Sequence, residues 1–565
     1  MTRPVPRRAC TAALLLTLVA AGAGAQGAPV DSALLRQAVA AVAVPATQGT
    51  LRADRAALRR LYEGVGFRPL WVTGTGVPTR QAMQAVDALE HADTRGLRPA
   101  DYDAAALYAR AVALAQAGPE RAGEAARVDA ARFDAALSAS LMRLLAQLHA
   151  GRVDPTTLRF RLPASHEHVD LAGLVTRASR ATDVAAVVAG AEPPFAGYAA
   201  LTRALARYRA LAADSTLRPP TAVRKALRPG AAYADAPVLR RLLAALGDLS
   251  ATARAPDSAA DTLYDAALVD AVMAFQRRHG LEPDGIIGPA TSAQLRVPLA
   301  RRVEQIALAL ERWRWLPDDP PARYLVVNIP AFQLRFFERD SAASCPVLVT
   351  DVIVGQAEGR HDTPVFVGTM RQVVFRPYWD VPLSIARNEL LPKIRRDRSY
   401  MDREDLEIVR GGDDDAVIHA PTAANLARVA AGTLRLRQRP GPKNSLGLVK
   451  FLFPNPYNVY LHGTPAQQLF GRARRDFSHG CIRVAEPVSL AEAVLRGQDG
   501  WDRAAIEAAM QGTRTQRVDL ERPVTVFVLY ATVVADDDGT VHFHPDLYGH
   551  DAALARVLGT GGDGR

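Results

Sequence analysis

The hydrophobic period of this 565-residue chain changes near Tyr324, and that change limits what the chain can fold into. Over residues 26–235 apolar side chains recur at helical spacing, whereas after Tyr324 β-branched and aromatic residues gather in short runs. Six runs have strand character: residues 324–329, 333–338, 347–354, 366–376, 459–462 and 524–534. Since the chain is too long for one ordinary domain, we expect a multidomain α+β protein.

The N-terminal part shows one strongly apolar helix face. Its members are Phe133, Leu137, Leu141, Leu144, Leu145 and Leu148, and Gly151 follows as a helix end. Residues 51–62 and 198–211 have the same helical spacing. No catalytic constellation is visible here, so we expect a helical scaffold domain over residues 26–235 whose role is support.

Residues 236–298 form a second, compact helical unit. Pro237 suits the first turn of a helix that ends at Gly247, and a second helix is predicted from residue 265 to the stop at Gly280. A turn and a third helix start follow. We therefore expect a small three-helix domain.

Three further segments complete the chain. Residues 299–322 predict a connecting helix that packs back on the scaffold, which would make the compact unit an insertion. The mostly β domain covers residues 323–555 and is interrupted by a polar, helical insertion at about residues 383–447. Residues 556–565 are rich in glycine and are expected to be disordered.

Residues 1–25 predict a secretory signal peptide. Arg3, Arg7 and Arg8 precede an apolar stretch at residues 12–21, and small residues follow as a cleavage site. That stretch is too short to span a bilayer, and no other stretch is long enough. We expect an exported protein of the periplasm or cell envelope without a transmembrane anchor.

Charge and cysteine content exclude several classes of function. The formal net charge is +10, but no Lys/Arg-rich run carries interleaved aromatics, so no nucleic acid is expected as a partner. Cys345 and Cys481 remain after removal of the signal peptide. A disulfide between them would consume the thiol of Cys481, so we expect Cys345 to be a buried apolar residue. His542 and His544 alternate on a strand, but two histidines without a third ligand do not predict a metal site.

The residues that carry chemistry lie between Tyr460 and Arg483. A thiol is a nucleophile only as thiolate, and its free pKa of about 8.5 leaves little thiolate at neutral pH. A histidine within hydrogen-bond reach takes the proton and later returns it to a leaving amine. Cys481 and His462 supply this pair, and Gly480 lets the backbone turn so that N–H groups face an oxyanion.

Two histidines compete for the role of base. His479 lies two residues from Cys481 in a turn, where its ring is poorly placed to meet the sulfur. We therefore assign the base to His462, and to His479 a backbone amide near the oxyanion and a role in holding the loop. Because Gly463 has no side chain, a backbone carbonyl or another residue must orient His462.

The run Ser-His-Gly-Cys-Ile-Arg at residues 478–483, preceded by His462, resembles the motif of the L,D-transpeptidase (YkuD-type) family. The resemblance implies an enzyme that remodels bacterial peptidoglycan, with Cys481 as nucleophile and His462 as general base. It places the oxyanion hole at the amides around residues 479–481. It implies no metal or organic cofactor, and acylation of the cysteine by carbapenems.

The resemblance extends to the other domains. The run Phe-Gln-Arg-Arg-His-Gly-Leu … Asp-Gly-Ile-Ile-Gly-Pro-Ala-Thr at residues 275–291 is similar to the hallmark of the small peptidoglycan-binding domain, the alternative being a structural spacer. Residues 68–71 and 151–155 resemble the scaffold domain of the larger L,D-transpeptidases. In such proteins the insertion at residues 383–447 forms a mobile lid over the catalytic groove.

Several residues are candidates for substrate contact. Tyr460, two positions before His462 on a strand, faces the same side and is expected to contact the substrate carbonyl or to steer the base. Arg483 either binds a substrate carboxylate or pins the loop to an acid, and the loop role is slightly favoured. Trp379 is equally compatible with a groove wall and with plain core. The predicted substrate-binding set is Tyr378, Trp379, Asn444, Tyr460, Gly463, Ser478 and Arg483, beside the catalytic set Cys481, His462, His479 and Gly480.

The resemblance also implies a reaction on peptidoglycan stem peptides and glycan. Cys481 attacks the carbonyl of the third stem residue, typically meso-diaminopimelate, and expels the terminal D-alanine. The thioester passes to the side-chain amine of another stem, which makes a three-to-three cross-link. Water or a lipoprotein amine is an alternative acceptor. A wall-binding scaffold with an inactive catalytic domain is a further alternative, which the intact Cys481, His462 and His479 disfavour.

Overall fold

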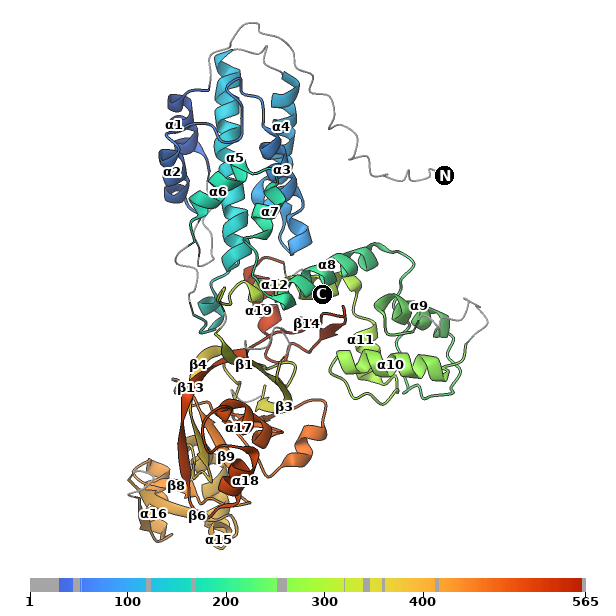
Figure 1. The fold of residues 1–565 in the computed structure, drawn as a ribbon. Helices are drawn as coiled ribbons and strands as arrows, with labels where there is room; N and C mark the ends of the chain where they lie inside the picture. The colour runs from blue at the N-terminus through green and yellow to red at the C-terminus, as the bar shows by residue number, and fades with distance from the viewer. Residues whose placement is uncertain are drawn as a thin grey trace.

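The structure, a computed structural model, has three lobes: a helical bundle, a small helical unit beside it and a β domain (Figure 1). It describes residues 30–43, 51, 53–117, 123–163, 169–250, 262–319, 321–338, 346–357, 361–411 and 416–560. The expected signal peptide and Cys345 lie outside these residues. None of the described helices is long and apolar enough to cross a membrane. The predicted multidomain α+β class is confirmed.

The helical bundle is built around one long helix, α5 (Glu124–Ala150). Its predicted apolar face is fully buried, and Gly151 ends it with a φ of 80°. Buried Asp134 of this helix accepts hydrogen bonds from the Tyr62 hydroxyl (2.6 Å) and the Trp71 amide (2.6 Å), which fixes the preceding segment to α5. The surrounding elements are α1 (Ser32–Ala41), α2 (Arg55–Gly64), α3 (Arg80–Glu90), η1 (Ala92–Arg95), η2 (Pro99–Tyr102), α4 (Ala104–Ala117), η3 (Pro155–Leu158), α6 (Leu171–Arg180) and α7 (Val184–Ala189).

Two helices join the lobes. Helices α8 (Ala196–Ala213) and α12 (Leu299–Trp313) pack on each other and on the hairpin of β14 (Val533–Ala535) and β15 (Val541–Phe543). The connecting helix therefore packs back on the scaffold, as expected. The compact unit is inserted between these two partner helices (Figure 1).

The compact unit contains α9 (Ala236–Leu246), α10 (Ala266–Arg278) and α11 (Pro289–Leu295). Its core also takes side chains from the preceding segment, among them Val223 and Leu227, and Leu227 pairs with Ile287. The unit thus begins before residue 236. Sequence periodicity missed this start because the segment is extended and contributes single anchors rather than a repeating face.

The β domain, which carries the candidate catalytic residues, is a closed barrel. A nine-stranded sheet runs in the order β11-β3-β12-β10-β9-β4-β13-β1-β2, and pairing of β2 with β3 closes it. Its strands are β1 (Arg323–Asn328), β2 (Gln333–Glu338), β3 (Leu348–Gly355), β4 (Phe366–Phe375), β9 (Val449–Leu452), β10 (Leu461–His462), β11 (Asp476–Ser478), β12 (Ile482–Val484) and β13 (Gln516–Leu529). Helices α17 (Pro487–Leu495) and α18 (Arg503–Gln511) pack on the barrel core, and η6 (Gln467–Gly471) lies in the loop after β10.

Two predicted bounds in this domain are wrong. The strand expected at residues 524–534 starts at Gln516, because a polar stretch before Val524 pairs with β4 across an irregularity in the register. It ends at Leu529, and β14 begins only at Val533. The C-terminal helix α19 (His550–Val557) also enters the tail expected to be disordered, because Leu554 and Leu558 pack into the barrel core.

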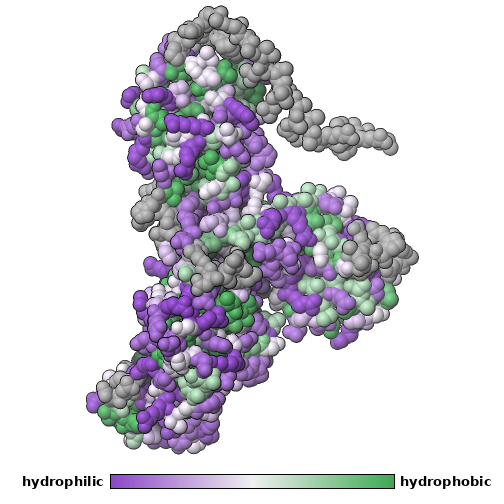
Figure 2. Space-filling view, in the orientation of Figure 1, coloured by the Kyte–Doolittle hydropathy of each residue, from purple (hydrophilic) through white to green (hydrophobic). Residues whose placement is uncertain are grey.

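The insertion at residues 383–447 has a core and a sheet of its own. It contains α13 (Leu383–Ile385), η5 (Ala386–Leu390), α14 (Leu391–Arg396), α15 (Tyr400–Arg403), β6 (Leu406–Arg410), β7 (Val417–His419), α16 (Ala423–Ala431) and β8 (Arg435–Gln438). With β5 (Trp379–Asp380) these strands form a four-stranded sheet, so the expectation of a helical insertion is incomplete. We call residues 383–447 the lid. Exposed Val417 and Ile418 on β7 make part of its surface apolar, and Figure 2 shows hydrophobic colour at that end of the molecule.

Candidate active site

The site is a row of side chains on one face of three barrel strands. Leu461 of β10 pairs with Phe451 of β9 and with Ile482 of β12, and all three are buried in the barrel core. Because side chains alternate along a strand, the next residues point to the opposite face. There His462 lies between Lys450 and Arg483.

Cys481 stands on the same face, two residues before Arg483 and one strand from Tyr460. The Tyr460 carbonyl accepts a hydrogen bond from the Ile482 amide (3.1 Å), which holds the two strands together at this point. The thiol donates to the carbonyl of Asn458 across 3.7 Å. Burial raises the pKa of the Cys481 thiol, whereas Tyr460, Lys450 and Arg483 lower it. The resting group is therefore a neutral thiol.

His462 is buried and held as a neutral ring. Its Nδ1–H donates to the carbonyl of Gly463 (2.5 Å), so the backbone supplies the orienting group that the sequence left open. Burial lowers the pKa of His462 to about 3, and the positive charges of Arg483 and Lys450 add to the effect. With Nδ1 protonated, Nε2 carries the lone pair that accepts a proton.

The loop that carries Cys481 is shaped by glycine and serine. Gly480 has a φ of 112°, a conformation that L side chains rarely adopt. Its N–H donates to Ser478 Oγ (3.1 Å), and Ser478 Oγ donates to the Cys481 carbonyl (2.5 Å). Ser478 is buried and its hydroxyl is bound within the loop, and its contact with substrate stays a prediction. The Gly480 amide is likewise occupied and does not point at a substrate oxyanion.

The ring of His479 faces the lid rather than the sulfur. Its Nε2 lies 2.7 Å from Oε1 of Glu389 in η5, and its ring meets that of His361 edge-on at 4.7 Å. The imidazole therefore links the nucleophile loop to the lid. This placement agrees with its assignment as a loop residue.

The lid returns to the site at both of its ends. Trp379 on β5 packs on the lid core. Burial raises the pKa of the Tyr460 phenol, and a side-chain hydrogen bond with Trp379 lowers it. The indole therefore lies beside that phenol. Trp379 thus packs as part of the lid core, and its role as a groove wall stays a prediction. The guanidinium of Arg437 lies over the Tyr378 ring at 4.0 Å, so Tyr378 helps to anchor the lid.

Two predicted groove residues are structural. Asn444 is buried, and its side chain donates to the carbonyls of Pro377 (3.1 Å) and Arg439 (3.0 Å), so it fixes the end of the lid. Gly463 is buried and orients His462. The turn at Gly447 brings the end of the lid against Gly463, since a Cβ at Gly447 would lie 2.6 Å from the Thr464 nitrogen. Sequence position near the motif suggested the groove, but these polar groups are used by the backbone.

Several site residues were missed by sequence reasoning. Lys450 and Asn458 act on the base and the thiol, and Glu389 meets His479. Thr363 donates to the Gly480 carbonyl (2.9 Å) and so holds the nucleophile loop. Lys450 lies on β9, and the pairing of β9 with β10 places it opposite His462. That strand pairing could not be predicted from the sequence.

The comparisons with known proteins agree with this site. Residues 322–517 match the family model described as "L,D-transpeptidase catalytic domain". Residues 234–295 match "Putative peptidoglycan binding domain" and residues 56–205 match "Scaffold domain". A protein from Haemophilus influenzae named "Putative L,D-transpeptidase" is 30% identical over 252 residues, which are 44% of this chain and 49% of that protein. The chain thus spans about half the length of this curated relative.

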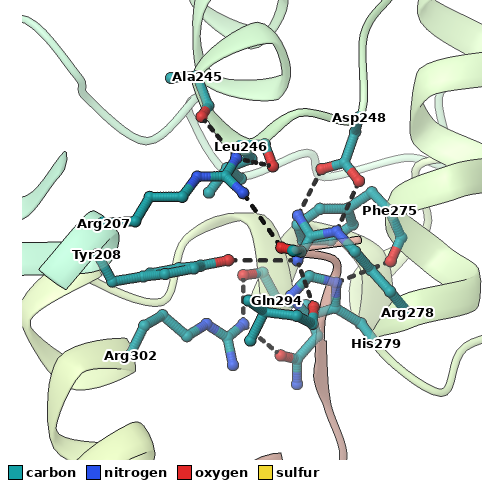
Figure 3. Close-up of polar contacts among 12 residues, drawn as sticks. Arg207, Tyr208, Ala245, Leu246, Asp248, Phe275, Arg278, His279, Gln294 and Arg302 are labelled. Atoms are coloured by element: carbon teal, nitrogen blue, oxygen red, sulfur yellow. Dashed lines mark hydrogen bonds and ion pairs between the residues drawn. The ribbon is translucent and has the colours of Figure 1, made fainter. Parts of the chain in front are cut away.

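The compact helical unit is docked against the β domain and the helical bundle through a buried polar cluster (Figure 3). Arg278, from its hallmark run, forms an ion pair with Asp248 (Nε to Oδ1, 2.6 Å) and donates to the Val541 carbonyl on β15 (3.3 Å). From the other side, Arg207 of α8 donates to the carbonyls of Ala245 (3.1 Å) and Leu246 (2.6 Å).

Aromatic and histidine rings complete this interface. His279 stacks on Phe275 (3.8 Å) and on Phe543 (5.6 Å), and the Arg302 guanidinium lies over Phe543 at 4.6 Å. Gln276 of the same run bonds only within the domain, for example to Asp284 (2.9 Å). The hallmark residues thus serve folding and docking.

Among the residues that the structure describes, no group of three or more His, Cys, Asp or Glu is placed to hold a metal ion. His542 instead contacts Asp536 (2.8 Å) on the neighbouring turn.

Proposed function

We propose that this protein is an exported cysteine L,D-transpeptidase that acts on tetrapeptide stems of peptidoglycan. The observation that carries the proposal is the shared strand face of Cys481 and His462, inside a domain that matches the L,D-transpeptidase catalytic domain. On that face lie a thiol and a neutral imidazole whose Nδ1–H is bound to a carbonyl. That arrangement is the one that base-assisted thiol attack requires.

The first half-reaction forms a thioester. Binding of a donor stem turns Sγ away from the Asn458 carbonyl, and catalytic hydrogen bonds are often formed only in the substrate complex. Sγ attacks the carbonyl carbon of the third stem residue while His462 Nε2 takes the thiol proton. The Cys481 amide and the Tyr460 hydroxyl donate to the oxyanion. Collapse returns the proton to the leaving amine and expels D-alanine.

The second half-reaction passes the acyl group to an amine. The side-chain amine of a second stem attacks the thioester carbonyl, and His462 removes the proton of that amine. The thiolate leaves and is reprotonated by His462, which restores the resting enzyme. The product is a three-to-three cross-link, and no metal or organic cofactor takes part.

The other domains support a location in the cell envelope. A match to the peptidoglycan-binding domain makes glycan and stem peptides the natural partners. The basic first residues and the apolar stretch behind them support export to the periplasm. Water and a lipoprotein amine remain alternative acceptors for the same thioester.

The proposal is tested with the purified chain and defined tetrapeptide muropeptides, with products resolved by mass. A cross-linked dimer with loss of one D-alanine supports the cross-linking reaction. Trimmed monomers alone would assign water as acceptor, and wild-type protein that yields neither product would contradict the proposal. Addition of a lipoprotein-derived peptide with a free lysine amine tests the third acceptor.

A further inference from the structure

Among the residues that the structure describes, Arg483 is a cation of the site without an anionic partner. It lies on β12, opposite His462 and two residues after Cys481, and it lowers the pKa of both groups. Side chains two apart on a strand stand about 6.6 Å apart on the same face. The guanidinium is therefore beside the atoms that react.

Other arginines of this domain form ion pairs with acidic side chains. Arg475 meets Asp351 (2.8 Å), Arg474 meets Asp476 (2.6 Å) and Arg323 meets Glu338 (2.8 Å). Within the described residues, Arg483 makes no such ion pair, and its buried Nε has no hydrogen-bond acceptor. In the alternative role, Arg483 pins the loop to an acidic residue. The described part of the chain places no acidic residue where it could do so.

An unpaired, partly buried guanidinium is unfavourable for stability. Burial lowers the pKa of Arg483, which shows that its charged form is poorly solvated. A buried charge without a partner destabilises a protein unless a ligand supplies the counter-charge. The planar fork of arginine suits a carboxylate, which accepts two parallel hydrogen bonds.

We propose that Arg483 binds a free carboxylate of the donor stem next to the scissile carbonyl, and so determines donor specificity. The inference rests on the proposed function. Two donor carboxylates fit this chemistry: the C-terminal carboxylate of the leaving residue and the side-chain carboxylate of the diamino acid. The former is one residue from the carbonyl that Cys481 attacks, about 3.8 Å between Cα atoms, which is within reach of a long side chain beside Cys481. A donor extended by one residue would displace that carboxylate.

The experiment separates donor binding from turnover. Binding is measured by calorimetry in the Cys481→Ala background for three donors: the free tetrapeptide, its C-terminal amide and its side-chain amide. Replacing the recognised carboxylate should weaken binding roughly 10–100-fold, the usual strength of charge-assisted hydrogen bonds. Arg483→Gln should weaken binding of the free tetrapeptide by the same factor and abolish the discrimination. Arg483→Lys, which keeps the charge but loses the fork, should lie between.

Two controls exclude a merely structural role. Arg474→Gln removes an exposed arginine near the same loop and should leave all three affinities unchanged. Arg483→Gln should melt no lower than the parent, because it removes an unpaired charge. A lower melting temperature without loss of discrimination would overturn the inference.

The outcomes also separate this inference from the proposed function. Suppose that acid and amide donors bind equally well while the wild-type enzyme still transfers acyl groups. That result would overturn the role of Arg483 and leave the proposed function standing. Loss of acid-over-amide discrimination in Arg483→Gln supports that role. Discrimination that persists in Arg483→Gln contradicts it.

Discussion

Burial and partners distinguish the two histidines nearest to Cys481. His462 is enclosed, neutral and bound through Nδ1 to the Gly463 carbonyl, which leaves Nε2 as the acceptor. His479 is partly exposed and meets Glu389 of the lid. A half-exposed ion pair of this kind is worth about 0–1 kcal/mol, so its loss should perturb the site little.

The base assignment predicts unequal losses in two variants. His462→Ala should slow acylation of Cys481 by a carbapenem roughly 10²–10⁴-fold, the usual worth of general acid–base help. His479→Ala should slow it less and lower the melting temperature slightly. Because burial raises the pKa of Cys481, higher pH generates thiolate and should partly rescue His462→Ala. Stopped-flow acylation across pH checks this, and a slower His479→Ala that high pH rescues would contradict it.

The conformation of Gly480 predicts a second residue-scale effect. Gly480→Ala places a side chain at a φ of 112°, which strains the backbone by about 1–3 kcal/mol. The strain should shift the Cys481 amide and reduce the acylation rate with an intact His462. Gly471→Ala, in the same domain at a site with open space, is the matched control. Equal acylation rates in both variants would argue against a shaped nucleophile loop.

At this scale the sequence predicts candidates for the nucleophile and the base, which lie on one strand face, and it predicts less well how the polar residues around them are used. Cys481 and His462 could be predicted because their chemistry fixes the residue types and strand alternation fixes the face. Ser478 and Asn444 could not, because a polar side chain near a motif serves either a ligand or the backbone, and only packing decides which. The need for a carbonyl behind His462 was predictable, since Gly463 offers no side chain.

At the scale of elements, the lid is held by a buried ion pair. Arg437 on β8 pairs with Glu407 on β6 (Nε to Oε1, 2.8 Å) and covers Tyr378. The strands of the lid were not predicted, because β6 and β8 are short and lie among polar residues. Their pairing depends on a small core that includes Ile408 and Leu436.

This ion pair predicts that the lid can be unfolded without the barrel. Glu407→Ala removes the carboxylate partner of the buried Arg437 guanidinium, and breaking a buried pair costs about 3–5 kcal/mol. Hydrogen exchange should then speed up in residues 383–447 and stay slow in the barrel strands. Arg403→Ala, which removes an exposed pair with Asp397, is the control and should change exchange little. Faster exchange throughout the barrel would show that lid and barrel unfold together.

At the scale of the whole molecule, the peptidoglycan-binding domain has a fixed position. Its partners across the interface are far apart in sequence, as with Arg278 and Val541, so no local pattern could have revealed the docking. Three helices and the motif were predictable from spacing and glycine positions. Burial of His279 depends on Phe543, which comes from the other end of the chain.

Two histidines of this interface, the buried His279 and the half-buried His544, predict acid sensitivity. Burial lowers the pKa of His279 well below its usual value and that of His544 to about 3. Unfolded histidine titrates near 6.5, so this stability is fully present above about pH 6.5 and is lost as pH falls towards 3. For each histidine, the free energy of unfolding falls by up to about 1.4 kcal/mol per pH unit in that range.

Melting curves between pH 7.5 and 5 test this prediction. His544→Phe should reduce the pH dependence of the melting temperature, because it removes a group that protonates on unfolding. His91→Gln, at an exposed site, should keep the wild-type dependence. A His544→Phe variant with the full wild-type dependence would show that other groups cause the acid sensitivity.

The most direct test of the account is the mass of the enzyme trapped with a donor. The purified chain is mixed with a tetrapeptide stem that lacks an acceptor amine, quenched in acid within one turnover, and mapped by peptide mass. We predict a mass gain equal to the donor minus D-alanine, located on Cys481 and absent in Cys481→Ala. An adduct that persists in Cys481→Ala, or D-alanine release without any adduct on Cys481 in the wild-type chain, would contradict it.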